Sequence, residues 1–141
     1  MNKINYFLFC IILLLFCNIQ QVKSRPLNLA KTTEKILSSL GTGTYYDVAA
    51  GFGSCGEMNS NDDMVVAVNY IQMENGSNPN NNPRCDKKVK IIGKTRKVVT
   101  ARIVDTCPGC SSGSLDMSTA LFKKVCGDLA LGVCKIKWDF I

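Results

Sequence analysis

The 141-residue sequence contains no histidine, and after its first 24 residues it has no apolar run long enough to cross a membrane. Without histidine, a zinc site would have to use cysteines and carboxylates alone. The basic residues carry no interleaved aromatic stacking motif, which disfavours nucleic acid as a partner. We therefore expect no metal, no cofactor, no nucleic-acid partner and no transmembrane anchor.

The N-terminal segment is typical of a secretory signal peptide. Lys3 is followed by an apolar run from Phe7 to Cys17 and then by a polar stretch that ends at Ser24. This run is shorter than the roughly 20 apolar residues that a transmembrane helix needs. We expect cleavage near Ser24 and a secreted, extracellular mature chain that starts at about Arg25.

Cleavage at this point leaves six of the eight cysteines, an even number as a disulfide framework requires. The sequence alone does not fix their pairing. Pairing neighbours along the chain gives the hypothesis Cys55 with Cys85, Cys107 with Cys110, and Cys126 with Cys134.

The Cys107-Pro108-Gly109-Cys110 segment has the spacing of a redox pair, but serines and a glycine follow it where a helix would normally begin. A four-cysteine zinc site suits an oxidising compartment poorly. We therefore interpret this segment as a static disulfide.

The mature chain is basic, with 15 Lys and Arg against 11 Asp and Glu, a net charge of +4. A charge of this size is compatible with solubility alone. Six of the cations lie between Lys87 and Lys97, which predicts a basic face. Acidic glycans or an anionic cell wall are partners of the matching charge.

Hydrophobic patterning predicts a mostly β domain. Residues 25–41 have a weak helical pattern and are expected to form a leader into the domain. Short β-rich runs between turn residues predict strands over residues 44–47, 64–70, 88–92, 98–104 and 134–140. Apolar residues at helical spacing within residues 118–131 predict one substantial helix, which we place at residues 118–127.

Residues 75–83 are rich in asparagine, with two prolines and a glycine, so we expect a surface loop. The loop begins with Asn75-Gly76-Ser77, an N-glycosylation sequon. Asn75 is therefore a candidate glycosylation site.

Three aspartates are candidates for chemistry. Asp105 ends a β-branched run, and Asp116 lies between Leu115 and Met117, so alternation along a strand buries those two and sends the Asp116 carboxylate to the other face. Asp47 ends the first predicted strand.

Glycoside cleavage needs a protonated and an ionised carboxyl about 5 to 9.5 Å apart. Asp116 would be the acid if desolvation raises its pKa, with Asp47 or Asp105 as the ionised partner. Aspartates at strand ends also cap turns, which is the structural alternative.

Five sequence blocks occur in an order that resembles the double-psi β-barrel of expansin-like and RlpA-like proteins. The blocks are Thr44-Tyr45-Tyr46, Gly53-Ser54-Cys55-Gly56, Val104-Asp105-Thr106-Cys107-Pro108-Gly109-Cys110, Leu115-Asp116-Met117-Ser118 and Lys135-Ile136-Lys137-Trp138. The resemblance implies a six-stranded barrel with one helix over residues 42–141. Among these proteins, the sequence most resembles the small single-domain secreted forms that are common in fungi.

The resemblance also implies site residues. The wall-loosening groove of bacterial expansins corresponds to Thr44, Asp105 and Asp116. Family 45 cellulases, a related barrel, place a base at the position of Asp47 and an acid at that of Asp116. RlpA-type lytic transglycosylases pair an aspartate, here Asp105, with a histidine, which this sequence lacks. The second, carbohydrate-binding domain of expansins is not expected here.

We therefore predict a secreted expansin-like monomer that binds cell-wall polysaccharide (cellulose, chitin or β-glucan) in an acidic groove without hydrolysis. The groove would be lined by Thr44, Tyr46, Asp105 and Asp116, while Trp138 is expected to be buried with its indole N–H bonded. Two alternatives remain open. One is a family-45-like hydrolase that uses Asp47 and Asp116. The other is a protein-binding effector or an inhibitor of papain-like cysteine proteases, acting through loops at residues 51–61 or 75–83.

Overall fold

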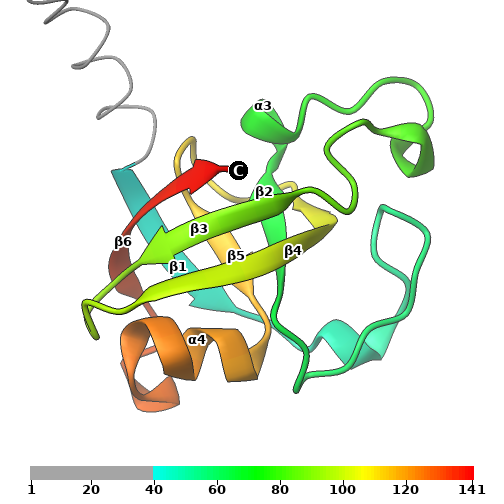
Figure 1. Ribbon diagram of the computed structural model, residues 1–141. Coiled ribbons are helices and arrows are strands. Elements are labelled where there is room, and N and C mark those ends of the chain that lie inside the picture. Colours follow the sequence, from blue (N-terminus) through cyan, green and yellow to red (C-terminus); the bar gives the residue numbers. More distant parts are fainter. Residues whose placement is uncertain (1–39) are drawn as a thin grey trace, which may run out of the picture. The chain divides into compact units, whose positions relative to one another are not determined.

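The computed structural model describes residues 40–141, so the predicted signal peptide and residues 25–39 lie outside the described part. Six strands form a closed barrel in the order β1-β5-β2-β4-β3-β6 (Figure 1). Their bounds are β1 (Leu40–Tyr45), β2 (Val65–Asn69), β3 (Lys88–Ile92), β4 (Val98–Cys107), β5 (Leu115–Met117) and β6 (Cys134–Phe140). The pairs β1–β5 and β2–β4 are parallel, and the other four pairs are antiparallel. The predicted fold class is confirmed.

One substantial helix, α4 (Thr119–Cys126), lies within the predicted residues 118–127. Its N-cap is Ser118, whose hydroxyl accepts the Leu121 N–H at 3.2 Å, and it ends at Gly127, where φ is 102°. The remaining helical segments are short: α3 (Tyr70–Met73) and the 3-10 turns η1 (Val48–Ala50), η2 (Pro79–Asn81) and η3 (Leu129–Leu131). No helix within residues 40–141 is long and apolar enough to span a membrane.

The first strand begins earlier and ends earlier than the sequence pattern predicts. Residues 40–43 pair with residues 134–137 of β6, so the last two residues of the expected leader belong to the barrel. Gly41 permits this because a Cβ there would lie 1.9 Å from the Gly113 carbonyl oxygen. The strand stops at Tyr45, and Asp47 instead caps the turn η1.

The core fills the barrel and the space under α4. Val66, Val68, Ile103, Leu115 and Met117 are fully buried inside. Leu121, Phe122 and Val125 of α4 pack onto the same cluster. Trp138 is 2% exposed and its indole Nε1–H donates to the Gly113 carbonyl at 2.7 Å, which confirms the prediction for this residue.

A β-bulge in β4 determines what faces outward. Val66 pairs with Ile103, but Ala67 pairs with Asp105, so Val104 is an extra residue. Val104 is buried in a second, smaller cluster with Val48 and Val65. The bulge places Asp105 opposite Ala67.

On its other edge, β2 pairs with β5, where Asp116 lies opposite Ala67. Asp116 in turn pairs with Thr44 of β1. Thr44, Asp116, Ala67 and Asp105 therefore form one row over four adjacent strands.

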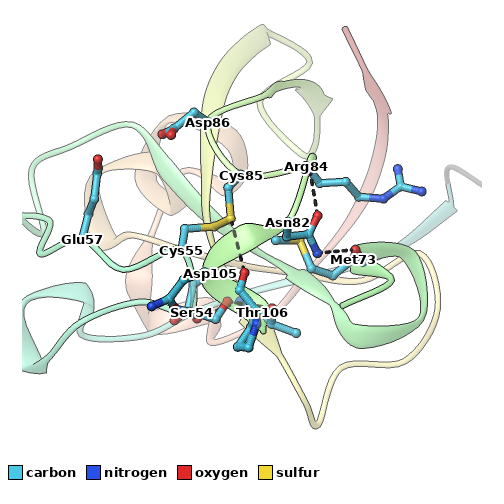
Figure 2. The surroundings of a disulfide bond; sticks show 12 residues. Ser54, Cys55, Glu57, Met73, Asn82, Arg84, Cys85, Asp86, Asp105 and Thr106 are labelled. Atoms are coloured by element: carbon cyan, nitrogen blue, oxygen red, sulfur yellow. Dashed lines mark hydrogen bonds between the residues drawn. A yellow bond between two sulfur atoms is a disulfide. The ribbon is translucent and has the colours of Figure 1, made fainter. Parts of the chain in front are cut away.

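Three disulfides are formed, and they match the neighbour-pairing hypothesis. The Cys126–Cys134 bond joins the end of α4 to β6, and the Cys107–Cys110 bond closes the turn after β4. The Cys55–Cys85 bond joins the loop after η1 to the segment before β3 (Figure 2). These bonds occupy all six cysteines of the described chain, so none is available as a thiolate ligand.

Candidate functional site

Asp116 forms one half of the site. Thr44, its register partner on β1, donates its hydroxyl to Asp116 Oδ1 at 2.7 Å. Burial raises the pKa of Asp116, and the nearby charge of Asp105 raises it further. The hydrogen bonds from the Thr44 hydroxyl and the Met117 backbone N–H act in the opposite direction but do not cancel the effect of burial.

Asp105 forms the other half. Its Oδ1 accepts the backbone N–H groups of Ser54 and Thr106, each at 2.7 Å, and its Oδ2 accepts the Tyr46 hydroxyl at 3.2 Å. Burial is the main cause of a raised pKa for Tyr46, followed by the charge and hydrogen bond of Asp105 and the charge of Asp116. The Tyr46 phenol therefore stays protonated and acts as a donor.

The loop that donates to Asp105 lies directly on the β-bulge. A Cβ on Gly53 would lie 2.4 Å from the Val104 carbonyl oxygen, so only glycine fits without a shift. The same oxygen accepts the Cys55 N–H at 3.2 Å. Ser54 lies between these two residues, and Figure 2 shows it beside Asp105 and the Cys55–Cys85 bond. The bulge and the disulfide together hold the Ser54 N–H on the carboxylate.

Polar contacts continue from Asp105 toward the predicted glycosylation site. The hydroxyls of Ser54 and Thr106 are 2.8 Å apart, and Asn75 donates its side-chain Nδ2 to Thr106 Oγ1, also at 2.8 Å. Asn75 is exposed, and an asparagine must be exposed to carry a glycan. Its glycosylation stays a prediction.

A cavity of about 320 Å³ opens beside Asp105 and is also lined by Tyr46, Asp47, Phe52 and Asn59. Phe52 is 75% exposed and stands between two glycines. Sequence reasoning missed this residue. The sequence did contain an indication that Phe52 is exposed. It is a single aromatic residue between Gly51 and Gly53, in a segment without a strand or helix pattern that would place it in the core.

Asp47 lies at the cavity but is held as a cap. Its Oδ1 accepts the Ala49 N–H at 3.1 Å and the Asn61 side-chain amide at 2.7 Å. The structural alternative considered for strand-end aspartates therefore applies to this residue. Thr44, Tyr46, Asp105 and Asp116, by contrast, come together as two hydroxyl–carboxylate pairs.

No protein-family model matches the sequence. The papain inhibitor of Streptomyces mobaraensis is 30% identical over 105 residues, which cover 72% of this chain and 70% of that protein. A solved structure of the Streptomyces papain inhibitor superposes with a TM-score of 0.62 at 30% identity and covers 72% of this chain and 91% of the inhibitor. An Asp f 7 allergen homologue of Arthroderma benhamiae is 39% identical over 83 residues, 58% of this chain but only 27% of the relative.

An expansin of Clavibacter michiganensis, solved in complex with cellohexaose, has the same fold. The TM-score is 0.61 at 24% identity, over 73% of this chain and 50% of the expansin. The chain therefore spans half of that protein, and the likeness shows the fold alone. The sequence and structural match to the papain inhibitor places this chain in the family of RlpA-like double-psi β-barrel proteins that includes that inhibitor.

Proposed function

We propose that the protein is a secreted polysaccharide-binding protein that holds a cell-wall glucan or chitin chain without cleaving it. The observation that carries the proposal is the pair of adjacent hydroxyl–carboxylate contacts, Thr44 with Asp116 and Tyr46 with Asp105. A polysaccharide offers a row of hydroxyls that both donate and accept. Such hydroxyls match this arrangement better than an anion would, because two carboxylates repel anions.

The site is preorganised for such a ligand. Two backbone N–H groups fix the Asp105 carboxylate, so little side-chain freedom is lost when a sugar binds. Hydrogen bonds from sugar hydroxyls to ionised carboxylates are charge-assisted and stronger than neutral ones. The exposed ring of Phe52 adds an apolar surface at the cavity on which a sugar ring can lie.

The contacts favour binding over hydrolysis. Hydrolysis needs a protonated acid and an ionised partner that is free to act on water or on the sugar. Burial suits Asp116 to the role of acid. Asp47 caps η1, however, and both oxygens of Asp105 already accept hydrogen bonds. Asp105 therefore has hydrogen bonds at both oxygens, and Asp47 has two at Oδ1, so each candidate partner is held by contacts that compete with the second role.

Asp116→Asn is expected to weaken binding to insoluble cellulose, chitin or β-glucan by about tenfold or more, the usual range for a lost hydrogen bond to a charged group. Wild-type binding should also weaken as the pH falls through the raised pKa of Asp116, because the carboxylate becomes neutral. A pull-down on each polymer, with reducing ends assayed in the supernatant, measures both effects. Asp62→Asn removes an exposed carboxylate of equal charge and is the matched control.

Folding stability separates this effect from damage to the protein. The folded pKa of Asp116 lies above its unfolded value, so its contribution to stability is fully present below the unfolded value and is lost as pH rises through the folded one. At neutral pH, Asp116→Asn should therefore unfold no more easily than the wild type. Sugar release that disappears in this variant would show a hydrolase. Failure of the wild type to bind any of the three polymers would refute the proposal.

Inhibition of a papain-like cysteine protease is the second candidate, favoured by the relative that shares 30% identity over 70% of its length. The exposed Phe52 lies within the loop at residues 51–61 expected for that role. Phe52→Ala should raise the inhibition constant for papain by about thirtyfold, the effect of losing an aromatic anchor. Val98→Ala, which truncates a 61%-exposed apolar residue at the start of β4, is the control.

Asp116→Asn distinguishes the two functions, because it should leave protease inhibition intact while it weakens polysaccharide binding. Absence of inhibition by the wild type in a papain assay would remove this second candidate.

A further inference from the structure

A second cavity, of about 670 Å³, is lined by residues of the turn between β3 and β4 and of α4. Figure 1 shows this turn beside the helix. Its lining comes from the residue before β2, the turn, the start of β4 and the last turn of α4: Met64, Thr95, Lys97, Val98, Val99, Thr100, Lys123 and Lys124. Three lysines therefore converge on one hollow, and no carboxylate is among the lining residues.

The walls of this cavity are fixed in the folded protein. The Thr95 hydroxyl donates to the Lys124 carbonyl at 2.8 Å, and the Thr95 N–H donates to the Val125 carbonyl at 3.1 Å. Gly93 allows the turn to approach this closely, since a Cβ there would lie 2.6 Å from a Val125 methyl. A ligand would therefore meet a preformed backbone frame and would have to order only the exposed lysine side chains.

The lysine charges are available to a ligand. The ion pairs within residues 40–141 are made by two arginines, Arg84 with Glu74 and Arg102 with Glu57 and Asp86. Lys97, Lys123 and Lys124 are exposed and take part in none of them. The cavity therefore concentrates positive charge that the protein does not neutralise.

The predicted basic face at residues 87–97 is divided by the fold. Lys88 and Lys90 are exposed on β3 and alternate with buried Val89 and Ile91, whereas Lys97 lines the cavity. Lys123 and Lys124 join Lys97 from α4. Sequence reasoning missed these two because they are distant in the chain and read as the polar side of an amphipathic helix.

We propose that this cavity binds a segment of an acidic polysaccharide, separately from the site formed by Asp105 and Asp116. The lysines would face its carboxylate or sulfate groups, and Met64, Val98 and Val99 would contact the apolar faces of its sugar rings. A concave site suits a linear chain better than the flat surface of a membrane. The site of Asp105 and Asp116 carries negative charge and the lysine cavity carries positive charge. One protein would therefore bind a neutral polymer at the first site and an anionic polymer at the second.

The test is binding to polygalacturonate and to dextran sulfate, with neutral dextran as the blank. The triple variant Lys97→Gln/Lys123→Gln/Lys124→Gln is expected to weaken binding by about tenfold at low salt, and wild-type binding should be largely lost at about 0.5 M salt. The matched control is Lys88→Gln/Lys90→Gln/Lys135→Gln, which removes the same charge from exposed strand positions and should change binding less than about twofold.

Equal losses in the two triple variants would overturn the proposal, because net charge and not the cavity would then govern binding. Lysine-dependent binding to vesicles containing about one-third phosphatidylserine, without polysaccharide binding, would also overturn it in favour of a membrane surface. The assay measures binding at the lysine site by itself, so its result does not depend on whether the site of Asp105 and Asp116 binds neutral glucan.

Discussion

Removal of the Cys55–Cys85 disulfide, by replacing both cysteines with serine, is expected to lower the free energy of unfolding by about 3 to 4 kcal/mol. The two cysteines are 30 residues apart, the longest loop closed by any of the three disulfides of the described chain. Its loss therefore gives the unfolded chain the largest gain in conformational freedom. Denaturant unfolding followed by circular dichroism measures the change.

The same variant is expected to lose polysaccharide binding, because Cys55 follows directly on Ser54, whose N–H donates to Asp105. The matched control is Cys107→Ser/Cys110→Ser, which opens a loop of only three residues and should cost about half as much stability. Equal costs for the two variants would contradict the loop-length argument. Full binding by the Cys55→Ser/Cys85→Ser variant would show that the disulfide does not position the site.

Gly53→Ala is expected to destabilise the protein by about 1 to 3 kcal/mol and to abolish polysaccharide binding at the site of Asp105 and Asp116. The added methyl would lie 2.4 Å from the Val104 carbonyl oxygen and 3.3 Å from the Asp105 Cβ. The loop would have to move away from the bulge and take the Ser54 N–H off the carboxylate. Thermal unfolding and the polymer pull-down measure the two effects.

Gly51→Ala provides the control on the other side of Phe52. A Cβ at Gly51 meets nothing within 4 Å, and its φ of 179° is ordinary extended backbone. This variant should change stability by less than about 0.5 kcal/mol and leave binding intact. If Gly53→Ala behaves like Gly51→Ala, the close approach at the bulge does not hold the site together.

Much of the barrel could be predicted because its strands follow simple patterns. Strands β3 and β6 match the predicted residues 88–92 and 134–140 in full, since their alternation of buried and exposed residues is regular. The alternation of residues along β5 also predicted the side of the strand on which Asp116 lies. Leu115 and Met117 are buried, and the Asp116 carboxylate faces the opposite side, where it accepts the Thr44 hydroxyl. The order of the sequence blocks supplied the family and hence the closure of the barrel.

Other features depend on contacts that no local pattern encodes. The start of β1 is determined by pairing with β6 and by the close approach of Gly41 to Gly113. Asp47 leaves the strand because Asn61, distant in sequence, joins the cap. The basic cavity combines Lys97 with two lysines of α4. Each of these outcomes requires knowing which segments meet in space.

The extra residue in β4 also determines which changes in length the protein can tolerate. Val104 only has to fill a small apolar cluster, so other aliphatic side chains can replace it at modest cost. Deleting it would remove the bulge and leave Asp105 opposite Ala67, but it would also remove the carbonyl oxygen that accepts the Cys55 N–H and lies against Gly53, so the loop that donates to Asp105 would lose its anchor. Insertions and deletions in a lineage of such proteins should therefore accumulate in loops such as residues 75–83. The interval between Ile103 and Asp105 should keep a constant length even where its sequence drifts.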